Sequence, residues 1–136
     1  MNKKSKGTNA ERELIHMLWA EGFACMRAPS SGAIKYPCPD IIAGNLIRKL
    51  AIECKATRNA KQYLTKKEIG ELKEFSLIFG TESWVGVRFD KSVDDNSWYF
   101  MNLEDLDKTE GENFVISLDS AKRKGLLFEE LVEINK

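Results

Sequence analysis

The stretch that decides the fold is Pro39-Asp40-Ile41-Ile42-Ala43-Gly44-Asn45, followed at residues 49–56 by Lys-Leu-Ala-Ile-Glu-Cys-Lys-Ala. The first part is a short apolar run that ends in a Gly-Asn turn, and the second alternates as a strand does. Together they predict a β-hairpin. Side chains two apart in a strand share a face, so Glu53 and Lys55 project together, and the hairpin returns Glu53 alongside Asp40. The pattern therefore predicts two carboxylates and an ammonium on one small patch of sheet.

These residue types are those of a phosphodiester-cleaving metal site. Mg²⁺ takes hard oxygen ligands and is usually held by one or two carboxylates together with substrate phosphates. A lysine beside the ion can orient or deprotonate a metal-bound water, as Lys55 would here. The alternative is a surface ion pair between Glu53 and Lys55, which stabilises little, and a bare P-D…E-x-K pattern occurs often by chance. The apolar strands and short turn around the acids favour the metal site.

A helix is predicted from about Thr8 to Glu21, with Thr8 and Glu11 as its capping box and Gly22 at its end. Glu11 shares the face of the apolar Leu14, so its carboxylate points towards the core near the sheet. Such a carboxylate costs several kcal/mol unless it is paired or metal-bound. The capping box alone would also explain Glu11, and both roles stay open.

The remaining segments predict a single α/β domain over residues 1–136, a mixed five-stranded β-sheet flanked by helices. We expect residues 1–7 to form a flexible basic arm. The other predicted elements are strands at 23–28, 84–89 and 97–102, a loop at 29–38, helices at 65–79 and 126–134, an extended segment at 113–118, and polar linkers at 57–64 and before the last helix.

Composition narrows the class of protein. The 136 residues are 43% hydrophobic, which is ordinary globular composition and excludes a disordered or low-complexity chain. The sequence shows no signal peptide and no apolar run long enough for a membrane span, so we expect a cytoplasmic, nucleoid-associated protein without membrane contact. Three cysteines and one histidine do not form a regular zinc site.

Charge is unevenly distributed along the chain. The total of 21 basic and 21 acidic side chains gives a formal charge of zero. Residues 1–68, however, carry 13 basic and 6 acidic side chains, whereas residues 69–136 carry 8 and 15. An asymmetry of this kind points to a polyanion partner, and the basic half is the one that holds the predicted site.

Four blocks of the sequence, taken in order, resemble the archaeal Holliday junction resolvases, which are PD-(D/E)xK (restriction-endonuclease-like) nucleases. The blocks are Lys6–Leu14, Gly22–Gly32, Pro39–Asn45 and Ala51–Lys55. The resemblance implies an endonuclease that resolves four-way DNA junctions by paired nicks, with Mg²⁺ (for which Mn²⁺ can substitute) and without an organic cofactor. The site residues that it implies are the metal ligands Glu11, Asp40 and Glu53, the catalytic Lys55 and the catalytic loop serine Ser31.

DNA binding has separate support in the basic half, because neutralisation of phosphates by Lys and Arg drives sequence-independent affinity. The alternative is that several of these side chains are merely solvated. No predicted helix resembles one that reads DNA bases. We therefore expect the protein to recognise the shape of the DNA rather than its sequence. By the resemblance, Arg12 and Arg27 hold the scissile phosphates. The predicted DNA contacts are Lys4, Lys6, Arg12, Arg27, Ser30, Lys35, Arg58 and Lys61.

Resolving a junction takes two opposed nicks, and a two-fold homodimer supplies two sites in the matching geometry. We predict its interface at Leu72, Phe75 and Phe79 of the second helix; the alternative is that all three are core. Two other functions stay open: a related nuclease acting on other DNA structures, and a junction-binding module without catalysis. The intact set of Asp40, Glu53 and Lys55 argues against the module.

Overall fold

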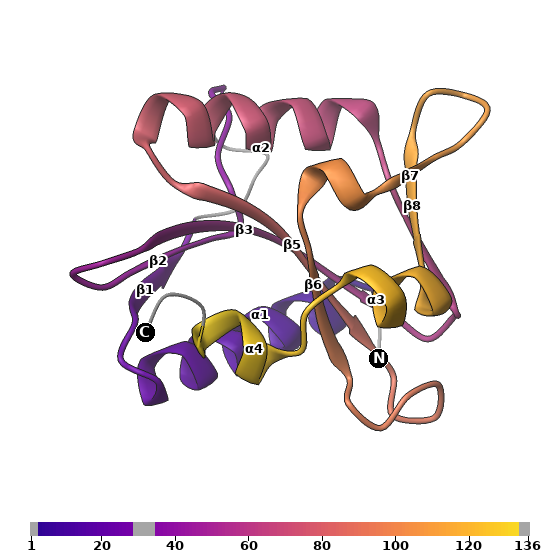
Figure 1. Ribbon diagram of the computed structural model, residues 1–136, viewed down its shortest axis with the longest axis horizontal. Coiled ribbons are helices and arrows are strands. Elements are labelled where there is room, and N and C mark those ends of the chain that lie inside the picture. Colours follow the sequence, from indigo (N-terminus) through magenta and orange to yellow (C-terminus); the bar gives the residue numbers. More distant parts are fainter. Residues whose placement is uncertain (1–2, 29–34, 134–136) are drawn as a thin grey trace.

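The computed structural model describes residues 3–28 and 35–133, with the backbone alone at residues 3–6 and 8. Its centre is a mixed five-stranded sheet in the order β1-β2-β3-β5-β6 (Figure 1). Neighbouring strands are antiparallel except β3 and β5, which run parallel. The strands are β1 (Ala24–Arg27), β2 (Ile41–Gly44), β3 (Lys49–Thr57), β5 (Glu82–Phe89) and β6 (Trp98–Met101). This is the predicted fold class.

Helices cover both faces of the sheet. In Figure 1, α2 (Lys66–Phe79) lies on one face, and α1 (Lys3–Ala20) and α4 (Phe128–Glu133) lie on the other. Side chains of β3 alternate between the two layers: Leu50, Ile52 and Cys54 pack with α1, and Ala51 packs with α2. Because residues two apart share a face, Glu53 and Lys55 leave β3 on the α2 side.

The predicted hairpin of β2 and β3 is confirmed. Ile41 pairs with Ile52 and Gly44 with Lys49, so the register continues to place Asp40 opposite Glu53. The turn is closed by Asn45, whose Oδ1 accepts hydrogen bonds from the backbone N–H of residues 47 and 48 at 2.8 and 2.7 Å. Such a side-chain-capped turn is typical of asparagine.

Helix α1 begins at Lys3, five residues before the predicted start. Thr8 therefore lies inside the helix and cannot cap it, so the predicted capping box of Thr8 and Glu11 is wrong. Residues 3–7, predicted as part of a flexible arm, form the first turns of α1. Lysine is among the better helix formers, which allows the basic run to extend the helix. Helix α2 was predicted correctly: Thr65 caps it, and Gly80 ends it in the left-handed region at φ 91°.

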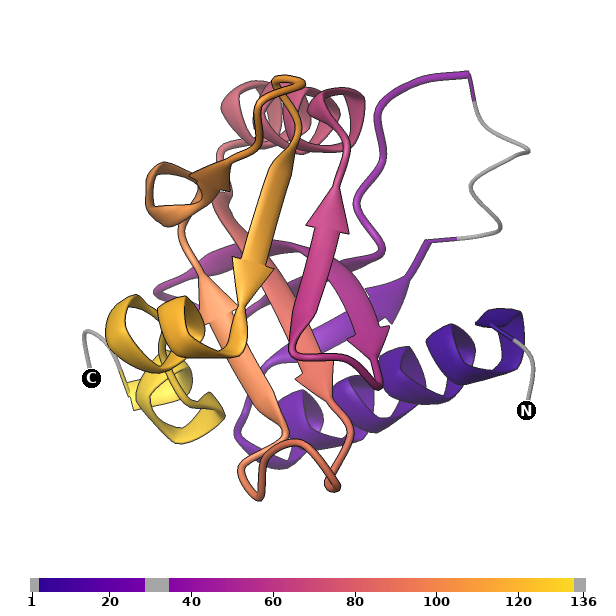
Figure 2. The same ribbon diagram turned by 90° about the vertical axis from the view of Figure 1, so that its right-hand side faces the viewer.

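A second, three-stranded sheet stands beside the first, in the order β4-β8-β7 (Figure 2). Its strands are β4 (Lys61–Leu64), β7 (Asp107–Lys108) and β8 (Phe114–Ser117). β4 and the helix α3 (Leu118–Lys124) occupy segments that were predicted as polar linkers. The prediction was wrong because most residues of these short elements are polar or basic and few are buried. The chain is completed by a 3-10 turn, η2 (Leu103–Asp105). No helix within the described ranges is long and apolar enough to cross a membrane.

Candidate active site

Asp40 and Glu53 form the acidic centre of the site. The two carboxyl groups lie close enough to share a hydrogen bond, and Oδ2 of Asp40 also accepts one from the backbone N–H of Cys54 at 2.8 Å. Burial, followed by the charge of Asp40, raises the pKa of Glu53 to about 9. Burial also raises the pKa of Asp40, although the Cys54 N–H and Lys55 oppose it. At neutral pH the pair therefore holds a proton, which a divalent cation would displace.

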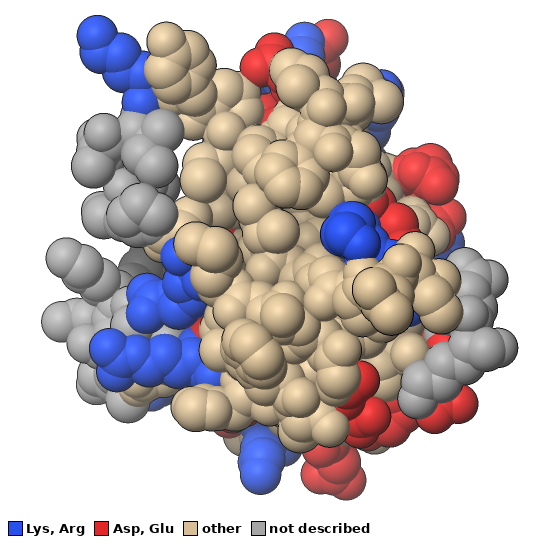
Figure 3. Space-filling view, turned by 90° about the vertical axis from the view of Figure 1, so that its left-hand side faces the viewer, with Lys and Arg blue, Asp and Glu red and all other residues tan. Residues whose placement is uncertain are grey.

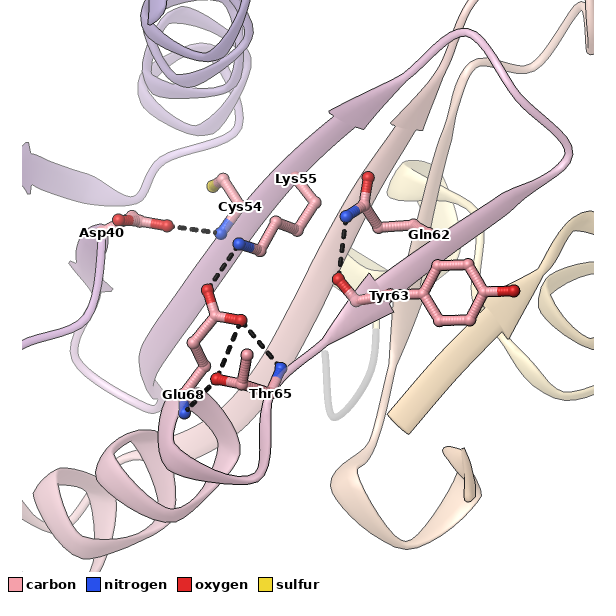
Figure 4. Close-up of polar contacts among 7 residues, drawn as sticks. All are labelled: Asp40, Cys54, Lys55, Gln62, Tyr63, Thr65 and Glu68. Carbon is pink, nitrogen blue, oxygen red and sulfur yellow. Dashed lines mark hydrogen bonds and ion pairs between the residues drawn. The ribbon is translucent and has the colours of Figure 1, made fainter. Parts of the chain in front are cut away.

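Lys55 lies beside this pair and contacts a carboxylate of helix α2. Its Nζ donates to Oε2 of Glu68, on α2, at 2.5 Å (Figure 4). Burial lowers the pKa of Lys55, but the hydrogen bond and charge of Glu68, with the charges of Glu53 and Asp40, outweigh it and leave the pKa above its ordinary value. At neutral pH Lys55 is therefore an ammonium, a donor and a positive charge rather than a base.

Glu11 approaches from the α1 side and is held by an arginine. Nε of Arg27, the last residue of β1, donates to Oε1 of Glu11 at 3.0 Å. Burial and the charge of Asp40 raise the pKa of Glu11, and Arg27 opposes this rise. The carboxylate is thus near Asp40 but already paired with Arg27, which accounts for a partly buried acid without a capping role.

The donor set fits a magnesium site of two carboxylates. Asp40 and Glu53 supply hard oxygen ligands on one patch, and substrate phosphates and waters complete such sites in proteins. Within the described parts of the chain, no group of three or more His, Cys, Asp or Glu side chains is gathered closely enough to hold a metal. Glu11, the third predicted ligand, belongs to α1 and pairs with Arg27, and its role as a ligand stays a prediction.

Most of the predicted DNA-contacting residues that the structure describes are exposed. Arg12, Lys35, Arg58 and Lys61 are exposed, and Arg27 is half-buried. In the view of Figure 3, Lys and Arg atoms gather along the left-hand edge, while Asp and Glu atoms gather along the right-hand and lower edges. The charge asymmetry of the sequence is thus partly visible on this face of the molecule.

Four of the predicted site residues fall where the structure describes no side chain. Ser30 and Ser31 lie outside the described residues. Lys4 and Lys6 lie in the first turns of α1, where the backbone alone is described. Their predicted roles stay predictions.

The predicted dimer residues divide between core and surface. Leu72 is 2% exposed and packs in the core between α2 and the sheet, which is the alternative that the sequence left open for it. Phe75 is half-buried and stacks on Phe79, with 5.2 Å between the ring centroids. Phe79 is 56% exposed, and the neighbouring Leu77 and Ile78 are 75% and 83% exposed. An apolar surface thus remains at the C-terminal end of α2.

Glu68 is the site residue that reasoning from the sequence missed. The signal was visible as T-x-x-E at residues 65–68, but this motif marks a helix start and says nothing about a second contact. The contact to Lys55 arises because α2 packs on the face of β3 from which Lys55 projects.

Comparisons with known proteins agree with this fold and identify the family. Residues 2–136 match the family model described as Archaeal holliday junction resolvase (hjc). The crossover junction endodeoxyribonuclease Hjc of Archaeoglobus fulgidus is 38% identical over 134 residues, covering 93% of this chain and 95% of the relative. The Hjc protein of Sulfolobus acidocaldarius is 36% identical, covering 97% and 90%.

A solved structure extends the likeness to three dimensions. The 1.6 Å structure of A. fulgidus Hjc, described as a Holliday junction resolvase from an archaeal hyperthermophile, matches with a TM-score of 0.83 at 36% sequence identity. The match covers 93% of this chain and 99% of that one. The chain therefore belongs to the archaeal Holliday junction resolvase (Hjc) family.

Proposed function

We propose that this chain resolves four-way DNA junctions by hydrolysing one phosphodiester bond in each of two opposed strands. The observation that carries the proposal is the paired carboxyl groups of Asp40 and Glu53 with the ammonium of Lys55 beside them. The exposed Arg12, Lys35, Arg58 and Lys61 support DNA binding, because cationic side chains attract a phosphate backbone. The action on chromosomal junctions implies that it works in the cytoplasm, at the nucleoid.

Asp40 and Glu53 are the residues that would hold the cation. Mg²⁺, or Mn²⁺ in its place, would supply a Lewis acid for the phosphate and would lower the pKa of a water molecule. The Cys54 N–H fixes Asp40, and the register across the hairpin keeps Glu53 opposite it. On cation binding the pair would lose its shared proton, which would leave both carboxylates charged and able to ligate.

The positively charged side chains around the site would bind the scissile strand. Lys55 is an ammonium and can donate to a phosphate oxygen or hold the attacking water, and no step requires it to lose its proton first. Arg27 combines the pairing with Glu11 and a partly exposed guanidinium, which suits a bidentate grip on a phosphate. Arg12, Lys35, Arg58 and Lys61 are exposed and extend the positive surface.

Two copies of the chain would provide the paired nicks. A two-fold axis relates both sites to the two-fold symmetry of a four-way junction. The apolar surface of Leu77, Ile78 and Phe79, with Phe75 stacked behind it, is the face that a second copy would cover.

A nicking assay on a synthetic four-way junction tests the proposal. Wild-type protein with Mg²⁺ should cut two opposed strands, and the linear duplex of the same sequence should stay largely intact. Asp40→Asn and Glu53→Gln should each abolish cleavage while junction binding persists. Equal cleavage of the duplex would indicate a related nuclease with another target. Binding without nicks in any cation would indicate a non-catalytic module.

A further inference from the structure

The contact between Lys55 and Glu68 joins two layers of the fold at the site. Lys55 belongs to β3 and Glu68 to α2, and their side chains are partly buried, at 25% and 31% exposed. Figure 4 shows the Glu68 carboxylate at the end of the Lys55 side chain, while Asp40 lies beside β3 and contacts the backbone of Cys54. The ammonium is thus fixed by a group outside the carboxylate pair that would hold the cation.

Glu68 is itself held in place by the start of α2. Its Oε1 accepts hydrogen bonds from the backbone N–H of Thr65 at 2.9 Å and from the Thr65 hydroxyl at 3.2 Å. The Thr65 hydroxyl accepts one in return from the N–H of Glu68 at 3.0 Å. One carboxylate oxygen therefore closes the capping box, and the other, Oε2, is left for Lys55.

The charge on Glu68 is secure at this position. Burial would raise the pKa of Glu68, but the hydrogen bonds from Lys55 and Thr65 outweigh it and bring the pKa below its ordinary value. The first turn of a helix also favours a negative side chain. Glu68 is therefore a fixed anion that needs no rearrangement to receive an ammonium.

Lys55 would need such an anchor because a bound cation would cancel its attraction to the Asp40–Glu53 pair. Its side chain carries about 2 kcal/mol of rotamer entropy, which must be lost to hold the ammonium at one place. The negative charge of the Asp40–Glu53 pair attracts it in the free protein, but a bound cation would neutralise that charge. Among the described carboxylates whose charges act on Lys55, Glu68 alone is outside the pair that would take the cation.

We propose that Glu68 is a positioning residue, which holds the Lys55 ammonium at the reaction centre through its Oε2 while its Oε1 caps α2. The inference rests on the proposed catalytic role of Lys55. Glu68 acts through Lys55 and touches neither the phosphate nor the cation. Its loss should therefore slow the chemical step without weakening junction binding.

Glu68→Gln is the informative variant, because glutamine also closes a capping box and preserves the helix start. At saturating junction and Mg²⁺, its single-turnover cleavage rate should fall about ten- to a hundredfold, the effect of losing one charged hydrogen bond. The KM and the Kd for the junction in EDTA should stay at wild-type values, and the Tm should fall only slightly, because glutamine keeps the capping box. If the slow variant were also largely unfolded at the assay temperature, the role of Glu68 would be merely structural, and the proposal would be overturned.

Glu71→Gln is the matched control. Glu71 lies one turn further along α2, is half-exposed and pairs with Lys67 at 3.9 Å. Its substitution removes the same charge from the same helix without touching Lys55, so the cleavage rate should be unchanged. A Glu68→Gln variant no slower than Glu71→Gln would refute the inference.

Two further measurements separate the possible failures. Lys55→Ala, assayed in parallel, must lose cleavage; if it does not, the proposed role of Lys55 fails and the role of Glu68 with it. In the metal-free protein, the ¹⁵N–¹H ammonium signal that disappears in Lys55→Ala should be sharp in wild type and broadened in Glu68→Gln. An unchanged signal in Glu68→Gln would show that Glu68 does not hold the ammonium.

Discussion

The backbone N–H of Cys54 donates to Oδ2 of Asp40 at 2.8 Å, across the hairpin of β2 and β3. This bond fixes Asp40 next to Glu53, so the two carboxyl groups cannot separate to relieve their repulsion. Glu53 responds by keeping its proton, with a pKa of about 9 for which burial is the larger cause and Asp40 the second. The free site is therefore held together at some cost to stability.

Stability should depend on pH through Glu53. The pKa of Glu53 rises on folding from 4.5 to about 9, so between these values the folded protein binds more protons than the unfolded chain. The free energy of unfolding must then fall as pH rises through this window. Glu53→Gln carries no such proton, so in EDTA its Tm should exceed that of wild type at pH 8 and depend less on pH. For a domain of this size, each kcal/mol gained moves Tm by about 3–5 °C.

The control for this measurement is Glu129→Gln, at an exposed position of α4. It should leave the pH dependence of Tm as in wild type. Mg²⁺ should stabilise wild type more at pH 8 than at pH 6, because the cation has fewer protons to displace. A wild-type Tm that rises from pH 6 to pH 8 in EDTA, with the same slope in Glu53→Gln, would contradict the assignment.

Arg27 should contribute one phosphate contact to junction binding. Its guanidinium is partly exposed and lies beside the acidic centre through Glu11. Arg27→Gln should lower the slope of log K against log salt by about 1, equally for junctions of different sequence. Fluorescence anisotropy across a salt series measures this slope.

Arg88→Gln is the matched control for Arg27. Arg88 also pairs with a glutamate of α1, Glu13, at 3.1 Å, but it lies at the end of β5 and outside the predicted DNA contacts. Its slope should equal that of wild type. Equal slopes for wild type and Arg27→Gln would remove Arg27 from the DNA interface.

The sequence was sufficient to predict those residues of the site that lie on the single hairpin of β2 and β3. The P-D run, the Gly-Asn turn and the alternation through Glu53 and Lys55 are local signals, and they place both acids and the lysine together. Glu68 could not be found this way, because its contact depends on how α2 packs across β3. The same limit explains Leu72, which has the same apolar signature whether it is buried or lies at an interface.

The predictions of where α1 starts and of residues 61–64 as a linker were wrong for a different reason. Thr8 and Glu11 match a capping box by spacing, yet the motif does not specify that the chain before it is non-helical. β4 has a polar exposed face and only four residues, so its alternation was hidden among basic side chains. Propensity and pattern are weak wherever an element is short or surface-facing.

Arg48 should be a major determinant of stability away from the site. It is 5% exposed, and its Nε and Nη2 donate to the two oxygens of Glu82 at 2.9 and 2.8 Å. Its Nη1 donates to the carbonyl oxygen of Leu131 in α4, so one side chain joins β5 and α4 at the β2–β3 turn. Arg48→Met leaves Glu82 and Leu131 without these donors and should cost about 3 kcal/mol, the lower end for a buried pair because Glu82 keeps some contact with water.

Urea denaturation of the metal-free protein measures this loss. Glu82→Gln keeps an acceptor for Arg48 and leaves the bond to Leu131, so its loss should be smaller. If Glu82→Gln were the more damaging of the two, the pairing would not be organised around Arg48.

The exposed apolar end of α2 should govern dimerisation. Phe79 is stacked on Phe75 and stands beside Leu77 and Ile78, and a charge placed among these side chains would be desolvated if a second copy covered them. Phe79→Glu should therefore sediment as a monomer at concentrations where wild type is a dimer. The monomer carries one site, so singly nicked junctions should accumulate where wild type gives paired cuts. Phe79→Tyr retains the ring and should behave as wild type. A Phe79→Glu protein that remains dimeric would place the two-fold interface on another face.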